Sequence, residues 1–413
     1  MKIVKLNSKQ FDLFTENHRY RNYYQTSMYS NVMSKFGYKT QYLGVVNENN
    51  SLIGAALILY RTIFMKYKIA YAPRGFLFNY ENKQKVYELT EQLKKVLGKS
   101  GFMLLRIDPY IPLTVRDANG AIMNFNNMGN TIIENIKDAG FKYKGKNLYF
   151  ETEKPRWEAL ITLQKNAEEI FAKLDKRTRN KIRKATNSGI IVSRDKSQGI
   201  TNLFKFIEQR DKKPLSFYQE MVKQFSENID IYYAKIKTET FLINSRRNYE
   251  KEQEYNDELA EKIQNMELND PDRNTYINKK IQSDKSITSY KANLLKATEL
   301  LKQKPDGITI AGAMVIRYDN AAYIFVEGIN ETYSNLNAGY LLKWQMINDY
   351  IQEGFKYINL NAIVGEFEKK NKYSGLNEVK LGFNSTVTEY IGEFDIVLNK
   401  FAYNLYEKMN KRS

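Results

Sequence analysis

The chain has 413 residues, enough for two or three ordinary domains, and 42% hydrophobic with 13% aromatic residues is typical of a globular protein. Cysteine is absent and His18 is the single histidine, which excludes disulfides and thiolate zinc sites and disfavours histidine triads or metal clusters. A net charge of +17 favours a polyanionic partner such as RNA, an acidic membrane face or a phosphorylated substrate. The alternative is a basic composition that only keeps the protein in solution.

The N-terminal residues and the apolar runs of the sequence do not suggest a membrane segment. The first residues, MKIVKLNSKQ, lack the apolar core of a signal peptide, and the longest apolar run, Leu52 to Tyr60, is too short to span a bilayer. We therefore expect a cytoplasmic protein, with peripheral contact to the inner face of the plasma membrane left open. No metal or cofactor is expected.

The first part of the chain predicts strands around one amphipathic helix. The helix carries apolar residues at helical spacing, and the segments beside it are short, apolar and bounded by turn residues. In order, we expect strands over 42–46, 52–59 and 67–71, the helix over 84–97, and a strand over 102–107 that Asp108-Pro109 ends.

A similar order returns late in the chain. We expect strands over 308–316 and 322–326, a helix over 341–351 and a strand over 357–360. Strand, turn, strand, helix and strand occurring twice indicate internal duplication of one α/β unit. This order resembles the core of the N-acetyltransferase (GNAT) fold, whose hairpin and helix frame an acyl-donor cleft. Neither copy has the glycine-rich loop that binds the pyrophosphate of CoA, so a different acyl donor is favoured.

Residues 241–306, between the two copies, predict a helical arm. The segment has 12 basic and 12 acidic residues and no glycine, and Asn269-Asp270-Pro271-Asp272 interrupts it once. A thin heptad seam is formed by Leu259, Ile263 and Met266 and then by Ile287, Leu294 and Leu301. We expect two antiparallel helices that project as a coiled coil, rather than a hairpin packed flat on the body.

The densest basic run is residues 173–184, with seven basic residues and one acid. On a helix, Leu174 and Ile182 would anchor one face. The opposite face would carry Lys176, Arg177, Lys181 and Lys184. Such a face can neutralise several phosphates of RNA, and this makes these four residues candidates for tRNA binding. The alternative is a solvated basic helix without a partner.

Lys380 lies between Val379 and Leu381 in a short apolar segment closed by Gly382-Phe383, before a β-rich tail over 387–397. We expect an extended segment here. Its lysine either faces water, which is the commoner case, or is a cation aimed into a site.

Taken together, these features resemble the Fem family of peptidoglycan interpeptide-bridge aminoacyltransferases, which includes MurM-like enzymes. The motifs that carry the resemblance occur in the family's order across nearly the whole chain. They are Tyr71-Ala-Pro-Arg-Gly75, Arg106-Ile-Asp-Pro109, the run KRTRNKIRKA, Gly339-Tyr340 before Trp344-Gln345-Met346-Ile347, Lys380-Leu-Gly-Phe383, and Tyr390-Ile-Gly-Glu-Phe394 before Asn399-Lys400.

The resemblance implies an α/β fold of two GNAT-like subdomains with an inserted coiled-coil arm. We place the first subdomain at 1–155, the second at 156–240 with 307–400, the arm at 241–306, and a basic C-terminal helix at 401–413. It also implies transfer of an amino acid from aminoacyl-tRNA to the stem-peptide amine of lipid II, or of its UDP-MurNAc-peptide precursor. Glycine is favoured, and alanine or serine is possible.

The resemblance further implies roles for single residues. Lys380 matches a lysine at the reacting centre, where a cation stabilises the oxyanion of acyl transfer, and Asp108 matches a suggested base, although Asp before Pro commonly only caps a turn. The candidate substrate-binding residues are Lys35, Arg74, Lys213, Phe217, Tyr218 and Phe325. Lys213 stands where the family often has arginine, and Phe217 and Phe325 stand where it usually has tyrosine. Two other functions stay open: a non-catalytic RNA-binding protein, and an aminoacyltransferase with a protein or lipid acceptor.

Overall fold

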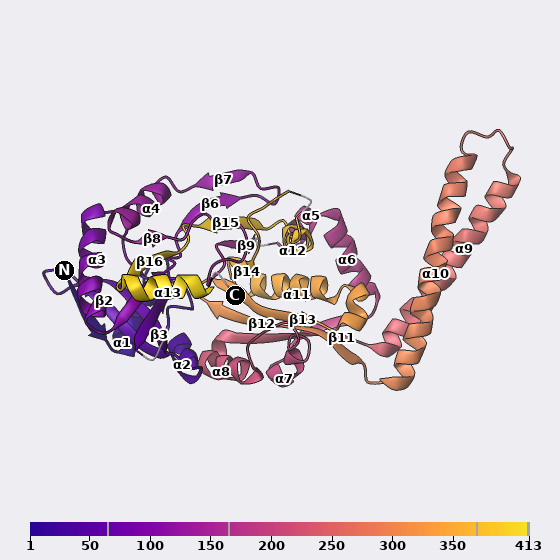
Figure 1. The fold of residues 1–413 in the computed structure, drawn as a ribbon. Helices are drawn as coiled ribbons and strands as arrows, with labels where there is room; N and C mark the ends of the chain where they lie inside the picture. The colour runs from indigo at the N-terminus through magenta and orange to yellow at the C-terminus, as the bar shows by residue number, and fades with distance from the viewer. Residues whose placement is uncertain (64–65, 164–165, 369–370, 411–413) are drawn as a thin grey trace.

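The computed structural model describes residues 1–63, 66–163, 166–368 and 371–410, and the strands among them form two sheets. Each sheet is the centre of one α/β unit, and a long helical hairpin projects from the second unit (Figure 1). The predicted fold class, a duplicated α/β unit with an inserted arm, is confirmed.

The first sheet has the strand order β1-β2-β3-β4-β5-β16-β8. Its strands are β1 (Lys2–Leu6), β2 (Lys39–Val46), β3 (Leu52–Ile63), β4 (Tyr67–Ala72), β5 (Phe102–Ile107), β8 (Lys142–Tyr143) and β16 (Phe394–Val397). Helices α3 (Lys83–Gly98) and α4 (Gly129–Asp138) pack together on its core, while α1 (Ser8–Glu16) and α2 (Ser27–Lys35) contact β2 and β3. The run Leu52 to Leu59 is almost wholly buried because helices cover both faces of the sheet.

The second sheet has the order β10-β11-β12-β13-β14-β9-β15-β6-β7. Its strands are β6 (Pro112–Arg116), β7 (Ile122–Phe125), β9 (Trp157–Thr162), β10 (Ile190–Arg194), β11 (Ile229–Ile236), β12 (Ile308–Tyr318), β13 (Ala321–Ile329), β14 (Tyr357–Ala362) and β15 (Thr386–Tyr390). Its helices are α5 (Ala167–Lys173), α6 (Lys176–Asn187), α7 (Gly199–Phe204), α8 (Leu215–Phe225) and α11 (Ala338–Gln352). All the strands and helices predicted for the two copies are present.

The duplication is visible in how the strands pair. In each unit, three consecutive strands pair antiparallel, a helix follows, and the next strand pairs in parallel with the third. The series β2-β3-β4-α3-β5 of the first unit therefore corresponds to β11-β12-β13-α11-β14 of the second. A polar turn over 47–50 joins β2 to β3, whereas the arm joins β11 to β12. The arm is therefore an expanded hairpin turn.

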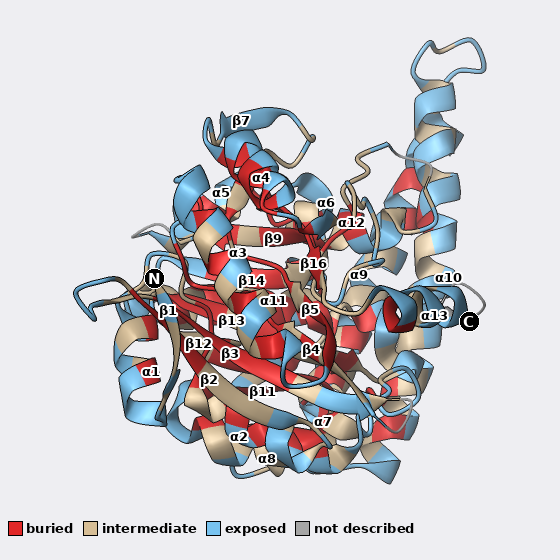
Figure 2. Ribbon diagram, turned by 60° about the vertical axis from the view of Figure 1, so that its left-hand side comes forward, coloured by how far each residue is buried: buried red, intermediate tan, exposed pale blue. Residues whose placement is uncertain are grey.

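The arm consists of α9 (Thr238–Asn265) and α10 (Arg273–Gln303). Leu259 is buried in the arm, Ala297 and Leu300 at its base join the hydrophobic core of the second unit, and much of the arm's surface is exposed (Figure 2). At the base, the Thr238 hydroxyl donates to the carbonyls of Lys304 and Pro305 at 2.8 and 3.0 Å and so ties the two helix ends together. The hairpin projects, as predicted, and does not lie flat on the body (Figure 1).

The two units are joined in two ways. A shared hydrophobic cluster brings α1 and α2 of the first unit against α7 and α8 of the second. In addition, the units exchange strands: β16, close to the C-terminus, completes the first sheet, while β6 and β7 extend the second. Arg106 of β5 fixes β16 through Asp395, with Nε–Oδ1 and Nη2–Oδ2 distances of 2.8 and 3.0 Å.

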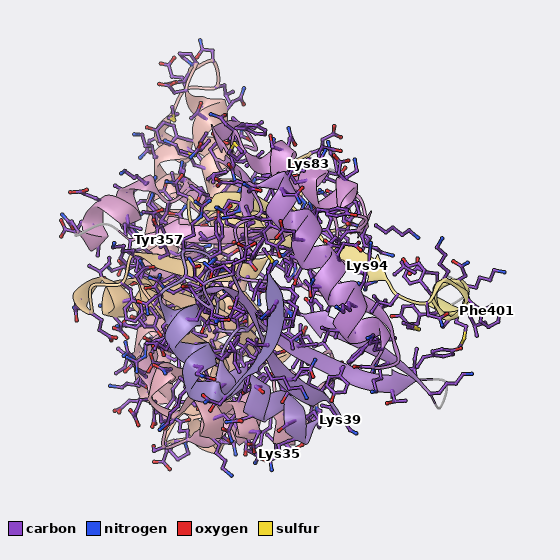
Figure 3. All side chains as sticks on the ribbon, turned by 90° about the vertical axis from the view of Figure 1, so that its left-hand side faces the viewer. Lys35, Lys39, Lys83, Lys94, Tyr357 and Phe401 are labelled. Atoms are coloured by element: carbon purple, nitrogen blue, oxygen red, sulfur yellow. The ribbon has the colours of Figure 1, made fainter. Side chains whose placement is uncertain are left out.

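The C-terminal helix α13 (Lys400–Asn410) lies on the first unit, where Ala402 and Tyr403 pack against Met103 and Leu104. Its residue Phe401 points away from the body (Figure 3). The last three residues of the predicted basic helix over 401–413 lie outside the described residues. Within the described residues, no helix has the length and apolar character needed to cross a membrane.

Candidate active site

Lys380 lies in the last turn of α12 (Ser374–Leu381), so the extended conformation predicted for this segment is wrong. The apolar residues around it suggested a strand, but the buried side of the helix is formed by Asn377 and Lys380, three residues apart. Asn377 ties the helix to the loop after β14, donating to the carbonyls of Val364 and Glu366 at 3.3 and 3.1 Å. A polar buried face leaves no helical apolar pattern in the sequence.

The Lys380 ammonium is directed into the protein, not into bulk solvent, and only 7% of the residue is exposed. It donates to the carbonyls of Leu360 and Ala362 at 2.6 and 2.5 Å. These carbonyls are available because β14 is irregular at Asn361, which adopts a left-handed φ of 65° and shifts the register with β9. Among the described residues these are its hydrogen bonds, which leaves one of the three ammonium donors for a bound group.

Lys380 therefore sits where β13 and β14 separate. The two strands pair in parallel from Ala321 and Tyr357 as far as Tyr323 and Asn359, but β13 continues to Ile329. In the first unit the corresponding strands β4 and β5 stay paired to the end of β4. The fork between β13 and β14 is thus a feature of the second unit.

Two further charged residues, one buried and one partly exposed, lie near this lysine. Lys343 of α11 is 3% exposed and forms an ion pair with Glu327 of β13. Burial would raise the pKa of the Glu327 carboxyl, but the Lys343 ammonium outweighs that effect and the pKa is lowered. Burial lowers the pKa of Lys380 to about 8, against the opposing attraction of Glu327. The fork thus holds a lysine whose proton is labile near neutral pH.

Glu158 of β9 is a buried carboxylate that links the two units. It pairs with Arg74 at 2.6 Å and accepts hydrogen bonds from Tyr110 at 2.9 Å, Asn359 at 2.7 Å and Tyr390 at 3.1 Å. With Tyr323 and Asn359 it lines a cavity of about 10 Å³, which has room for roughly one water molecule. Its negative charge also raises the pKa of Lys380, with a smaller effect than that of Glu327.

Asp108, the candidate base, follows β5 in the first unit and is 2% exposed. Its Oδ1 accepts the Arg74 backbone N–H at 2.6 Å, and its Oδ2 accepts the Tyr71 hydroxyl at 3.0 Å. Burial raises the pKa of the Asp108 carboxyl to about 6, although Arg74 opposes the rise. In this position Asp108 holds the loop that carries Arg74, as expected of an aspartate that caps a turn.

Arg74 is buried, and protein groups bind its guanidinium through Nη2, while its Nε has no hydrogen-bond partner among the described residues. It donates to Pro155 at 2.8 Å, pairs with Glu158, and lies 5.0 Å from the ring centroids of Tyr110 and Tyr390. It thus joins Asp108 to Glu158, and through that carboxylate to the fork. Direct contact of Arg74 with a substrate stays a prediction.

Four of the predicted substrate-binding residues lie together beside β13. The Lys213 ammonium is 5.3 Å from the Phe217 ring and 5.8 Å from the Phe325 ring. These two rings stack at 6.3 Å, and Tyr218 meets Phe325 edge-on at 6.3 Å. Because Phe325 and Glu327 are both on β13, this cluster and the fork share one strand.

Lys35 ends α2 and is exposed on the surface of the first unit (Figure 3). Its neighbour Phe36 contacts Phe217 edge-on at 5.2 Å. The structure therefore places Lys35 next to the Lys213 cluster across the contact between α2 and α8. Candidate residues from three separate segments, 35, 213–218 and 325, are therefore brought close to this junction of the two units.

The predicted basic helix is present as α6, and Ile182 anchors its buried face as expected. Leu174 is also buried, but it caps the end of α5 and is not part of the basic helix, which begins after Asp175. Lys176, Arg177 and Lys184 are exposed, and Arg177 pairs with Glu378 of α12 at 3.2 Å. Lys181 is half-buried and binds the Tyr340 hydroxyl at 2.8 Å. The four candidate tRNA-binding residues are thus on one helix, with Lys181 partly engaged by the protein.

Gly382 explains how α6 approaches the lysine. Its carbonyl accepts the Asp175 backbone N–H at 3.0 Å. A Cβ atom at this position would lie 2.3 Å from Thr178 Oγ1 and 2.6 Å from Asp175 Oδ2. The glycine in Lys380-Leu-Gly-Phe383 therefore allows the start of the basic helix to touch the turn after Lys380.

The profile of the FemAB family matches residues 6–411 of this chain, nearly its full length. The chain belongs to the FemAB family. It is 24% identical over 423 aligned residues to the aminoacyltransferase FemA of Staphylococcus epidermidis, and 24% over 426 to that of Staphylococcus aureus; each comparison covers 100% of this chain and 99% of the relative. A solved structure of FemX, 19% identical, superposes with a TM-score of 0.72 over 98% of this chain and 99% of FemX.

Three charged residues near the fork of this FemAB-family protein were missed by sequence reasoning, and two of them, Glu158 and Lys343, are buried. Glu158 stands in the apolar strand Trp157-Glu-Ala-Leu-Ile161, and Lys343 stands between Leu342 and Trp344. A lone charge in an apolar segment is the signal that singled out Lys380, and it applied equally to these two. Glu327, next to the glycine of a strand, gave no comparable signal.

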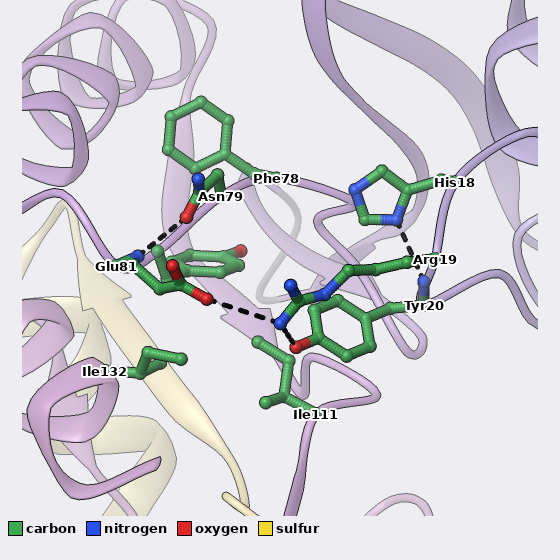
Figure 4. A pocket seen from close by; sticks show the side chains of 9 residues that line it. His18, Arg19, Tyr20, Phe78, Asn79, Glu81, Ile111 and Ile132 are labelled. Atoms are coloured by element: carbon green, nitrogen blue, oxygen red, sulfur yellow. Dashed lines mark hydrogen bonds and ion pairs between the residues drawn. The ribbon is translucent and has the colours of Figure 1, made fainter. Parts of the chain in front are cut away.

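A cavity of about 80 Å³ in the first unit lies away from these groups (Figure 4). It is lined by His18, Arg19 and Tyr20 from one segment and by Phe78, Asn79 and Glu81 from another, and the Arg19–Glu81 pair crosses it at 3.3 Å. Burial lowers the pKa of His18 to about 4, so the ring is neutral at physiological pH. This small cavity contains none of the predicted site residues of the FemAB-family protein.

Proposed function

We propose that this protein transfers an amino acid from aminoacyl-tRNA to the stem-peptide amine of lipid II or of its UDP-MurNAc-peptide precursor. The observation that carries the proposal is the buried Lys380 ammonium at the fork between β13 and β14, with one donor left for a substrate. Membership of the FemAB family and full-length similarity to proteins named aminoacyltransferase support the reaction class. Glycine is the amino acid we favour, with alanine and serine as alternatives.

The chemistry requires no covalent enzyme intermediate because the tRNA ester is already activated. The acceptor amine nitrogen attacks the ester carbonyl carbon, a C–N bond forms, and the bond to the ribose oxygen breaks. The amine proton ends on the departing ribose oxygen. In the transition state the carbonyl oxygen carries negative charge, and a fixed ammonium stabilises that charge more than it stabilises the neutral ester. We assign this role to Lys380.

The other groups position the substrates. We propose that Lys213, Phe217, Tyr218, Phe325 and Lys35 hold the precursor, with the lysines acting as point charges at its phosphates. A cluster of this kind at the junction of the units would present the acceptor amine to the fork.

The role of Asp108 as the base is tested by measuring the turnover of the Asp108→Asn variant. If Asp108 accepts the proton, turnover should fall by at least about a hundredfold with the fold intact.

The direct test uses purified protein, a set of charged tRNAs and lipid II. Mass analysis of the lipid II product identifies whether an amino acid is added and which one. A mass increase of one residue that depends on the charged tRNA supports the proposal. No increase with any charged tRNA, from protein that binds RNA normally, overturns it in favour of an RNA-binding role. Addition to a protein or another lipid overturns the acceptor assignment.

A further inference from the structure

An open groove lies between α5, α6 and α11, the helices that cover one face of the second sheet (Figure 1). Its volume is about 590 Å³, within the range of ligand sites. It is lined by Ala167, Glu168, Phe171, Ala172, Arg179, Arg183, Trp344 and Asn348.

The floor of the groove is aromatic. Phe171 of α5 and Trp344 of α11 have ring centroids 4.9 Å apart at an interplanar angle of 59°. The guanidinium of Arg183 lies 5.3 Å from the Phe171 ring centroid. Both rings are only half-buried, so they present π surface to the groove. Exposed aromatic and guanidinium planes are the surfaces on which unpaired bases stack.

The rim on α6 is basic. Arg179 and Arg183 are one helical turn apart and face the groove, and Lys176 is on the same side two turns before Arg183. Arg179 donates one N–H to the Ala172 carbonyl at 2.5 Å, which holds its guanidinium at the rim while other donors remain. Glu168 is the one carboxylate among the lining residues, so the balance at the rim is positive.

We infer that this groove holds the unpaired 3′-terminal nucleotides of the RNA donor, with bases on Phe171 and Trp344 and phosphates at Arg179 and Arg183. The inference rests on the proposed function, which makes aminoacyl-tRNA the donor. Exposed Lys176, on the same side of α6 as Arg179 and Arg183, is then available for a phosphate of the neighbouring duplex. Stacking of this kind carries no base sequence preference.

The position of α6 supports this assignment independently. Its first residues touch Gly382, two residues after Lys380, through the hydrogen bond from Asp175 and the close contact of Thr178. The helix that forms the basic rim therefore leads to the turn that follows the proposed catalytic lysine. An RNA end in the groove is held by an element that also contacts the turn after Lys380.

The test compares binding of two RNA hairpins, one ending in an unpaired CCA and one blunt, to the full-length protein at several salt concentrations. The chain has two tryptophans, and Trp157 is buried, so base stacking should quench Trp344 fluorescence. We expect Trp344→Ala to weaken binding of the CCA hairpin at least about fivefold, with an unchanged salt dependence. Arg179→Gln with Arg183→Gln should lower the slope of log K against log salt by roughly two.

Matched controls come from the first unit. Tyr87→Ala removes an exposed aromatic residue from α3, the counterpart of α11, and Lys83→Gln removes an exposed charge from the same helix. Both should bind the CCA hairpin like the wild type. Equal binding of the two hairpins, or unchanged binding by Trp344→Ala and the double arginine variant, overturns the groove assignment. If UDP quenches Trp344 fluorescence and the CCA hairpin does not displace it, the groove binds a nucleotide of the precursor. That result would also overturn the groove assignment.

The amino-acid transfer assay separates this inference from the proposed function. If the wild type transfers an amino acid and the groove variants bind RNA normally, the groove assignment is refuted and the proposed function stands. If the wild type binds the CCA end through Trp344 but modifies no precursor, the proposed function is refuted and the groove assignment stands.

Discussion

Replacing Lys380 with methionine should abolish most of the transfer activity while leaving a folded protein that binds precursor. Methionine matches the length and volume of the lysine stem, so the change removes the ammonium and little else. Removing one preorganised donor to an oxyanion typically costs about a hundred- to a thousandfold in kcat, or about 3–4 kcal/mol. We expect a loss of that size because this ammonium has one donor for the reacting carbonyl.

The effect on stability is the difference of two opposing contributions. Burial lowers the pKa of Lys380 from 10.5 to about 8, so the protonated lysine destabilises the fold by about 3 kcal/mol. That cost is full below about pH 8 and disappears as the pH rises towards 10.5, because the neutral form is the one that burial favours. Methionine removes the cost but leaves the carbonyls of Leu360 and Ala362 unpaired, at about 1–3 kcal/mol each. The two contributions largely offset each other.

The assay is single-turnover transfer with charged tRNA and lipid II, followed by mass analysis, beside thermal unfolding and equilibrium binding of the precursor. The expected pattern is a collapsed rate, a melting temperature within several degrees of the wild type, and precursor affinity within about threefold. Near-normal turnover in Lys380→Met would refute the catalytic assignment. If the rate is low only because Lys380→Met is unfolded, the melting curve will show it. In that case Lys380→Arg provides a folded variant for comparison.

Three further predictions follow from the same geometry. The transfer rate should fall as the pH rises through about 8, because Lys380 then loses its proton. The Lys380→Arg variant should not show that fall, because arginine stays protonated. The same fall in rate above pH 8 in the wild type and in Lys380→Arg would contradict this prediction. Gly382→Ala should lower the free energy of unfolding by about 1–3 kcal/mol in urea titrations and slow transfer, because the new Cβ would clash with Thr178. Gly375→Ala is its control in the same helix, with nothing within 4 Å of the added atom, so equal effects of the two changes would exclude the clash as the cause. Lys213→Ala should raise the KM for the precursor roughly tenfold with kcat retained, since a point charge contributes to ground-state binding; the exposed Lys205 provides the control, and an unaltered KM would remove Lys213 from the precursor site.

Local pattern was enough to predict most of the fold. The hairpins, the two helices at 84–97 and 341–351, and the arm are set by apolar periodicity and turn residues within short windows, and they are present. The strand β11 was not predicted, although Ile229 to Ile236 is apolar. Its partner β12 lies beyond the 241–306 arm, so no short turn marked the two as a hairpin.

The site was only partly predictable because its contacts join distant segments. Lys380 was singled out, but its helix was not, since Asn377 and Lys380 face inward in place of apolar residues. The ion pair between Arg74 and Glu158 crosses the junction of the two units, and the hydrogen bond from Asn359 to that carboxylate joins segments 201 residues apart in the sequence. A sequence shows that a carboxylate stands in an apolar strand, but not which cation will meet it.

The exchange of strands has a consequence for synthesis of the chain. As the protein leaves the ribosome, β1 to β5 can assemble early, but β5 lacks its neighbour until Phe394–Val397 has emerged. Throughout translation of the second unit, the first therefore keeps an open strand edge, the kind of surface that pairs with other chains. Pairing of β16 with β5 closes that edge. The same step brings the buried Asp395 carboxylate of β16 to its ion-pair partner, Arg106 of β5. Chains that stop short of β16 would carry an unfinished first unit, which gives quality control a physical means to recognise an incomplete enzyme.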